Sequence, residues 1–252
     1  MAYTDLSGSD FLRALNEENL RFADAAKRSG LAAEVVACPG WTVADLVFHM
    51  VKGQNMFHGM LTTPDATSPK DLPRLGRGAD GEALLAQFRE GAARLEAVLG
   101  ALADDTPVWT FTGGDVAQWV KRRQAQEVLV HRFDAETAGG AVAPADPVLC
   151  ADGIDEMLHV FLPRMSMEKL SMQGSVHFHC TDTDGEWMLT PVDGRVVVTR
   201  EHGKGSVALR GPAQLLLQVL WRRTSADDAL ARGAEMFGDR AALDALLAGL
   251  VV

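Results

Sequence analysis

Hydrophobic residues recur every three or four positions in four long segments of the first half of the chain, which is the spacing of amphipathic helices. These segments lie at about 10–29, 42–61, 82–103 and 115–138. Thr42 followed by Asp45 predicts a capping box at the start of the second helix. The fourth helix should end at the glycine pair Gly139-Gly140, since glycine accepts helix-terminating conformations. Four such helices predict a four-helix bundle over residues 1–140.

The pattern changes after this point. Residues 139–147 are rich in glycine, alanine and proline and are interpreted as an interdomain linker. Short segments of alternating character predict strands at 175–181, 186–190, 195–200 and 206–209. Helices are expected at about 153–162, 213–223 and 239–250. Pairs such as Asp193-Gly194 between the strands are typical of hairpin turns. Residues 148–252 are therefore predicted to form a small α+β domain with an antiparallel sheet, which makes the fold class α+β overall.

Composition narrows the possible functions of the 252-residue chain. A hydrophobic share of 47% supports a folded core, and a net charge of -10 argues against a nucleic-acid or anionic-membrane partner. No apolar run approaches the roughly 18 residues of a membrane span, and the first residues do not resemble a secretory signal. The protein is therefore expected in the cytoplasm. Its three cysteines form no C-x-x-C pair, so neither a disulfide framework nor a cysteine-rich zinc site is indicated.

Candidate chemistry centres on histidine and glutamate. Glu127 and His131 are four residues apart, so they share one helical face, and the residues between them are apolar. A buried pair of this kind needs a hydrogen-bond partner or a metal, and a simple hydrogen-bonded helix pair is one interpretation. His49 lies in a second apolar helical stretch. The alternative is a site of two imidazoles and one carboxylate from two helices, with a coordination position left open, as in catalytic zinc sites.

Two stretches resemble a known family. Residues 38–49, Cys-Pro-Gly-Trp-Thr-Val-Ala-Asp-Leu-Val-Phe-His, are similar to the opening motif of the mycothiol-dependent maleylpyruvate isomerase family, whose members contain a DinB-like metal-binding four-helix bundle. Residues 119–135, which include Glu127-Val-Leu-Val-His131-Arg-Phe-Asp134, resemble the second motif of that family. A looser likeness starts at Gly211-Pro212. The resemblance implies that His49, Glu127 and His131 are metal ligands and that the C-terminal domain has a sterol-carrier-like fold.

The resemblance also implies a reaction. A zinc ion, or another divalent metal, would stabilise the thiolate of mycothiol, a low-molecular-weight thiol. That thiolate would add to an electron-poor double bond of a small acidic substrate. Expulsion of the thiol after bond rotation would make the protein an isomerase, whereas retention of the adduct would make it a mycothiol S-transferase. A non-catalytic metal-binding or small-ligand-binding protein is the alternative from another class, and the oligomeric state is not predicted.

Several further side chains are candidates for supporting roles. Arg223 matches a family motif and could bind an acidic substrate, although Arg222 stands where the family usually has glycine. Asp134 could orient a metal ligand or could form a surface ion pair. The basic run at 121–123 is interpreted as a solvated helix face. His177 and His179, which carry no accompanying carboxylate pattern, are interpreted as exposed strand residues.

Overall fold

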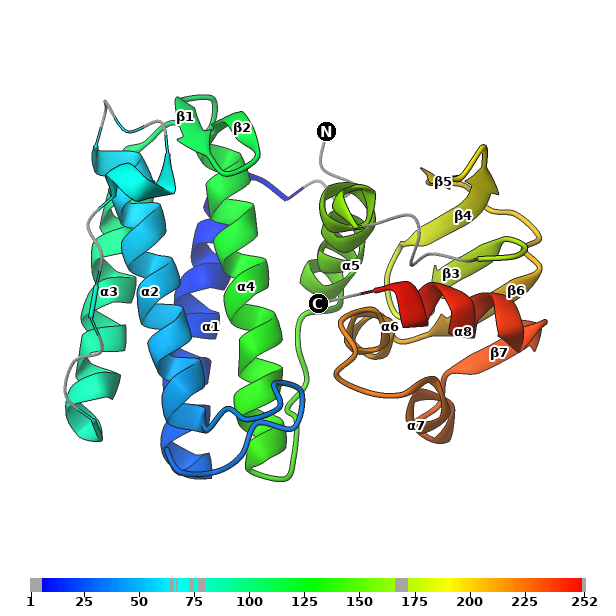
Figure 1. Ribbon diagram of the computed structural model, residues 1–252, viewed down its shortest axis with the longest axis horizontal. Helices are drawn as coiled ribbons and strands as arrows, with labels where there is room; N and C mark the ends of the chain where they lie inside the picture. The colour runs from blue at the N-terminus through cyan, green and yellow to red at the C-terminus, as the bar shows by residue number, and fades with distance from the viewer. Residues whose placement is uncertain are drawn as a thin grey trace. The chain divides into compact units, whose positions relative to one another are not determined.

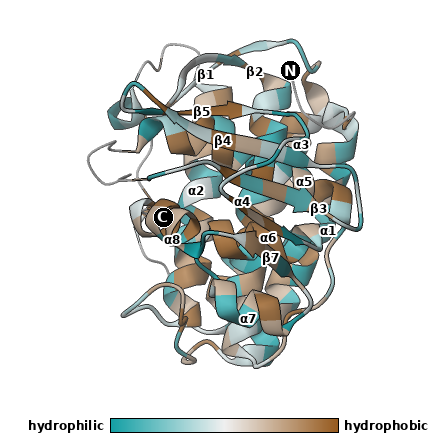
Figure 2. Cartoon of the chain, turned by 90° about the vertical axis from the view of Figure 1, so that its right-hand side faces the viewer, coloured by the Kyte–Doolittle hydropathy of each residue, from teal (hydrophilic) through white to brown (hydrophobic). Residues whose placement is uncertain are grey.

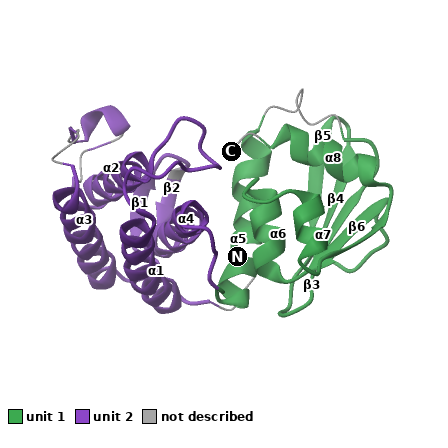
Figure 3. Ribbon diagram, turned by 90° about the horizontal axis from the view of Figure 1, so that it is seen from below, with its two compact units in different colours: residues 1–5, 144–252 green, residues 6–143 purple. Residues whose placement is uncertain are grey.

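The computed structural model divides the chain into two compact units, Leu6–Ala143 and a second unit that begins at Pro144 (Figure 3). The residues that the structure describes are 6–63, 66, 68–72, 75–76, 80–165 and 172–250. No helix within these ranges is both long and apolar enough to cross a membrane. Each unit has its own hydrophobic core, so each is described by itself.

The first unit is built on four long helices (Figure 1). They are α1 (Gly8–Ser29), α2 (Val43–Thr62), α3 (Glu82–Ala101) and α4 (Ala117–Ala138), with a short 3-10 turn at Pro69–Asp71. Helix α1 packs against α3 and α4, and α2 packs against α3 and α4. The predicted capping box is present: the Thr42 side chain accepts a bond from the Asp45 N–H, and the Asp45 carboxylate accepts one from the Thr42 N–H. The prediction of a helical N-terminal domain is confirmed.

The start of the fourth helix differs from the prediction. A two-stranded hairpin, β1 (Pro107–Thr110) and β2 (Gly113–Val116), precedes α4, whereas the sequence pattern placed Asp115 in the helix. Thr110 and Thr112 hydroxyls both donate to the Asp115 carboxylate, which closes the hairpin. The β-branched and aromatic residues at 108–112, followed by two glycines, were the local signal for this hairpin.

The second unit combines helices with one sheet. Its helical segments are α5 (Pro147–Glu156), a π turn (Met157–Phe161), a 3-10 turn (Leu162–Arg164), α6 (Ala213–Leu220), α7 (Ala226–Ala231) and α8 (Arg240–Gly249). Helix α5 begins earlier than predicted because Asp146 caps it and Pro147 occupies its first turn, where proline is tolerated. The segment assigned to a linker therefore ends in a helix start.

The sheet has five strands and is mixed rather than antiparallel. Its strands are β3 (Val176–Cys180), β4 (Glu186–Val192), β5 (Arg195–Thr199), β6 (Val207–Gly211) and β7 (Glu235–Gly238), in the order β5-β4-β3-β6-β7. Strands β3 and β6 pair in parallel, and the other pairs are antiparallel. The prediction of an antiparallel sheet was wrong at this pair because the connection after β5 returns across two strands before β6 begins. The sequence pattern also missed β7.

The two faces of the sheet differ in chemistry. Along β3, Val176 and Phe178 are fully buried, and helix α6 packs on this strand and on β6. In Figure 2 the brown parts of the ribbon mark hydrophobic residues, which occur along the strands and in α6. The alternate residues His177 and His179 point to the opposite face, since side chains alternate along a strand. That opposite face is called the outer face below.

Candidate metal centre

Helices α2 and α4 carry the three residues that are expected from the sequence to be metal ligands. His49 lies in the second turn of α2, and Glu127 and His131 lie one turn apart in the middle of α4. The two helices contact each other. Because residues four apart share a helical face, α4 presents its carboxylate and its imidazole in the same direction.

The three side chains converge on one point. The Glu127 Oε1 atom lies 3.2 Å from His49 Nε2 and 3.4 Å from His131 Nε2. The two imidazole rings are 4.9 Å apart between centroids and nearly perpendicular. One ligand atom from each residue can be chosen so that all three lie within 4.8 Å of one another. This group of His49, Glu127 and His131 is called the helical site.

A buried carboxylate stands behind one of the imidazoles. The side chain of Asp134 is fully buried, and its Oδ2 atom lies 2.8 Å from His131 Nδ1. This bond leaves His131 Nε2 facing Glu127, which is the orientation a metal ligand requires. Burial favours a positioning role for Asp134 over the surface ion pair that the sequence left open.

Arg123 belongs to the site, although the sequence pattern did not predict it. Its side chain is only 3% exposed, and its Nη2 atom donates to Glu127 Oε2 at 2.7 Å. Lys121 is also buried and binds the Leu102 carbonyl and Asp104, so the solvated-face interpretation was wrong for both residues. The four-residue spacing of Arg123 and Glu127 was the signal that could have revealed the pair.

The charges in the site are strongly coupled. Burial acts to lower the pKa of His131, but its bonds with Asp134 and Glu127 outweigh burial and raise this pKa to about 9. Burial acts to raise the pKa of Glu127, yet bonds with His131 and His49 and the charge of Arg123 hold it well below its usual range. In the metal-free protein, a proton on His131 thus balances the carboxylates. A divalent ion would displace this proton, so metal binding should strengthen as the pH rises.

The donor set fits a divalent metal. Arg123 engages one oxygen of Glu127 and Asp134 engages the outer nitrogen of His131, so each residue keeps one inward-facing donor. The side chains of His49 and Glu127 remain 34% and 29% exposed, which leaves the site accessible from solvent. Two imidazoles and one carboxylate with an accessible side are the ligand pattern of catalytic rather than structural zinc.

Comparison with protein families covers most of both units. The mycothiol maleylpyruvate isomerase N-terminal domain matches residues 12–136, and the C-terminal domain of the same family matches residues 149–245. The chain belongs to the mycothiol maleylpyruvate isomerase family. The resemblance inferred from the sequence motifs is therefore confirmed.

Solved structures agree with this family membership at the level of the fold. The crystal structure of the mycothiol-dependent maleylpyruvate isomerase aligns with a TM-score of 0.61, and a histidine-to-alanine mutant of it aligns with 0.63. Both are 14% identical to this chain, and each alignment covers 87% of this chain and 90% of the other. No curated protein matches the sequence.

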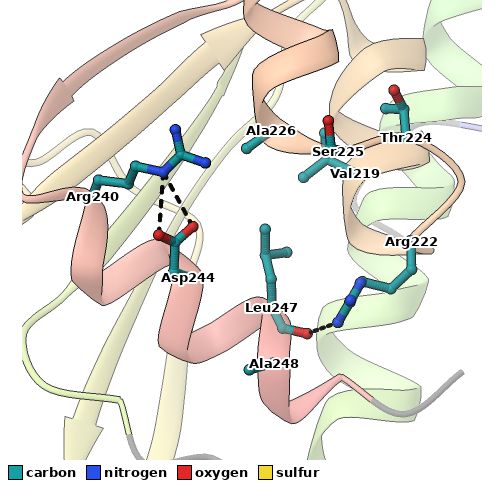
Figure 4. Close-up of a pocket in the computed structure, with 9 residues that line it drawn as sticks. All are labelled: Val219, Arg222, Thr224, Ser225, Ala226, Arg240, Asp244, Leu247 and Ala248. Atoms are coloured by element: carbon teal, nitrogen blue, oxygen red, sulfur yellow. Dashed lines mark hydrogen bonds and ion pairs between the residues drawn. The ribbon is translucent and has the colours of Figure 1, made fainter.

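The backbone at Arg222 explains why the family usually has glycine at this position. Arg222 adopts φ +59°, in the left-handed region that favours glycine. The Arg222 N–H bonds the Val219 carbonyl and the Arg223 N–H bonds the Gln218 carbonyl, which together form a Schellman motif that ends α6. The Arg222 side chain turns to the Leu247 carbonyl and lines a small pocket beside α8 (Figure 4).

Arg223, which matches the arginine of the family motif, lies shortly after the end of α6 in the second unit. Its Nη1 atom donates to the Trp221 carbonyl at 2.7 Å, and its guanidinium lies 5.8 Å from the centre of the Trp221 ring. These contacts hold the cation close to the end of the helix. A role of Arg223 in substrate binding is a proposal.

A second group of side chains that could hold a metal ion lies in the C-terminal unit. His177 is buried rather than exposed, and both His177 and His179 contact Glu186, so the interpretation as plain exposed strand residues was wrong. His202 contacts the same carboxylate. This group of His177, His179, Glu186 and His202 is called the sheet cluster. The sheet cluster was not predicted because it depends on the register that places Glu186 opposite His179 and on a loop that brings in His202 from 23 residues further along the chain.

Proposed function

We propose that this protein is a divalent-metal enzyme of the mycothiol-dependent isomerase type, with His49, Glu127 and His131 as the metal ligands. The observation that carries the proposal is the convergence of two imidazole nitrogens on one carboxylate oxygen at 3.2 and 3.4 Å. Membership of the family supports mycothiol as the thiol and a maleylpyruvate-like acid as the substrate. Zinc is the metal that the ligand set favours.

The charges around the helical site would favour the binding of a thiolate. Glu127 and Asp134 supply two negative charges, and Arg123 supplies one positive charge. With a divalent ion present and both histidines neutral, the site carries a net positive charge. When bound, the metal supplies a Lewis acid that favours the thiolate form of an incoming thiol.

Neighbouring side chains would orient the metal ligands. Asp134 holds the His131 ring so that its Nε2 atom faces inward, and Arg123 holds Glu127 so that a single oxygen faces inward. The Trp41 ring lies 5.3 Å from the His49 ring and limits its rotation from the side of the α2 start. Because these contacts already fix the ligand side chains, little side-chain entropy is lost when a thiol and an acid bind.

Arg223 is proposed as the cation that binds the carboxylate of the substrate. Its support is its position in the family motif and the bond that holds its guanidinium next to Trp221. An Arg223→Lys variant should raise KM more than it lowers kcat, because a point charge replaces the planar fork. Its metal content should equal that of the natural protein.

Elemental analysis of purified protein tests the metal ligands. The zinc content per chain should fall by one ion, that of the helical site, in His49→Ala and in His131→Ala, while circular dichroism shows an unchanged fold. His58→Ala is the matched control, since His58 lies on the same helix and its ring contacts Thr62. Retention of the metal at this site in both ligand variants would refute the assignment.

Incubation with mycothiol and maleylpyruvate tests the reaction class. Recovery of free thiol together with a trans product would identify an isomerase, and a stable thioether would identify an S-transferase. Absence of both products, from protein with a fully loaded helical site, would contradict this choice of substrate. A metal-binding or ligand-binding protein without catalysis would then be the remaining interpretation.

A further inference from the structure

The outer face of the C-terminal sheet gathers three imidazoles around one carboxylate. Glu186 Oε1 lies 2.8 Å from His179 Nδ1, and Glu186 Oε2 lies 2.8 Å from His202 Nδ1 and 3.3 Å from His177 Nε2. The three rings are between 5.7 and 6.5 Å apart and nearly perpendicular to one another. All four residues offer a ligand atom within 4.8 Å of the others.

The register of the sheet explains this convergence. Strands β3 and β4 are antiparallel, and His179 is directly opposite Glu186, so their side chains leave the same face. His177 is two residues before His179 and therefore shares that face. Two strands thus supply three of the four residues on rigid backbone.

The fourth residue comes from the loop that connects β5 with β6. Thr199, at the end of β5, pairs with Met188, which is itself opposite His177. The loop must therefore pass β4 and β3 to reach β6. A Cβ atom at Gly203 would lie 2.9 Å from the Met188 methyl group, and one at Gly205 would lie 3.2 Å from the His177 Cβ. The loop consequently crosses the outer face in close contact, directly over the histidines.

Both ends of this loop are tied down. At one end the Arg200 guanidinium binds the buried Asp155 carboxylate of α5 through two bonds of 2.7 and 2.8 Å. At the other end Ser206 and Ser175 exchange two bonds between their backbone N–H groups and hydroxyls. His202 is therefore placed over Glu186 by a loop whose path is set independently of the cluster.

From this geometry we infer that the sheet cluster is a second divalent-metal site of the protein. Its ligands are His177, His179, Glu186 and His202. Three imidazoles and one carboxylate suit zinc and related transition metals. Donor atoms around one zinc ion lie roughly 3.4 Å apart, given Zn–N distances of about 2.0–2.1 Å, so small side-chain rotations bring the present donors into range. The four ligands complete a tetrahedron, which is the pattern of a structural site.

The expected role of this metal is to hold the crossing loop against the sheet. Its ligands join β3, β4 and the loop, which are separated by up to 25 residues in the chain between His177 and His202. Since a metal binds the folded form preferentially, zinc should stabilise the second unit. This inference does not depend on the proposed function of the helical site.

Zinc titration of the metal-free full-length chain, followed by elemental analysis, tests the inference. The natural protein should bind two zinc ions per chain, and a His49→Ala/His131→Ala double variant should keep one. In that background, His202→Ala or Glu186→Gln should weaken zinc binding by more than about 10-fold. His202 is suited to this test because its side chain is 81% exposed, so its removal leaves the core intact.

Two controls and one spectroscopic measurement complete the experiment. Lys204→Ala, in the same loop, and His58→Ala, outside both sites, should leave the zinc content unchanged. In the double variant, zinc should shift the ring proton signals of His177, His179 and His202 in the NMR spectrum and leave those of His58 and His159 in place. The inference is overturned if the double variant binds no zinc at micromolar free metal, or if His202→Ala and Glu186→Gln retain the zinc affinity of the parent.

Discussion

In the helical unit two imidazoles share one carboxylate oxygen, whereas in the C-terminal unit three imidazoles share both oxygens of one carboxylate. The helical site is supported from behind by Asp134 and Arg123, which occupy the outer atoms of two ligands. In the sheet cluster both oxygens of Glu186 face imidazoles. Around a four-coordinate ion, three protein donors would leave one position open, and four protein donors would leave none. A candidate reaction centre and a candidate structural site therefore differ here in two ways, in the number of donor residues and in the side chains that hold those donors in place.

The largest effect is expected when the carboxylate is removed from each site in turn. Glu127→Gln should lower zinc affinity at the helical site by more than about 100-fold and abolish thiol-dependent activity, because the neutral amide loses the central charge. Glu186→Gln should leave the activity with mycothiol unchanged. Zinc content and turnover of both variants check this. Equal loss of activity in the two variants would show that the sites are not functionally distinct.

Removing an outer partner should have a smaller effect than removing a ligand. Asp134→Asn should weaken metal binding at the helical site by about 10- to 100-fold, because the His131 ring loses the charged group that orients it. Competition with a zinc chelator measures this affinity. Asp24→Asn, an exposed change on α1, is the control. An unchanged affinity in Asp134→Asn would mean that the geometry of His131 is maintained without Asp134.

Low pH should weaken the ion pair between Asp155 and Arg200, which holds one end of the loop between β5 and β6. Burial acts to raise the pKa of Asp155, but bonds with His159, Arg200 and Trp187 outweigh it and hold this pKa well below its usual range. Since the folded-state pKa is depressed, the stabilisation is present above the unfolded value of about 3.9 and is lost as the pH falls through the folded value.

Asp155→Asn should accordingly cost about 1.5 kcal/mol at neutral pH, the size of a charged hydrogen bond, and should flatten the acid dependence of stability. Thermal unfolding of metal-free protein at several pH values between neutrality and pH 3 measures both effects. A variant with the same acid dependence as the natural chain would assign that dependence to other carboxylates.

The smallest effect is expected at the end of α6. Arg222→Gly should relieve the left-handed strain but also lose the side-chain bond to Leu247 and increase the freedom of the unfolded chain, so the free energy of unfolding should change by less than about 1 kcal/mol. Arg222→Val is the contrasting variant, because a β-branched residue is poorly tolerated at positive φ and should destabilise clearly. Thermal unfolding compares the two. Equal stability of both variants would exclude backbone strain as the reason for the family glycine.

Local sequence patterns predicted the helices because helix periodicity and capping involve residues within a few positions of one another. Thr42 and Asp45 show this directly, as do the Glu127 and His131 positions on one face of α4. The apolar helical stretch around His49 made this residue the third candidate, and the family motifs then implied that all three are ligands. The burial of Arg123 against Glu127 was within reach of the same four-residue rule.

Other features depend on contacts between distant segments, which local patterns do not encode. The parallel pairing of β3 with β6 follows from the path of the loop after β5, and that path also brings His202 to Glu186. The alternation of β3 put His177 and His179 on one face in the sequence itself. That Glu186 and His202 meet this pair depends on the register of β3 with β4 and on the path of the loop after β5, and both are set by packing of the whole unit.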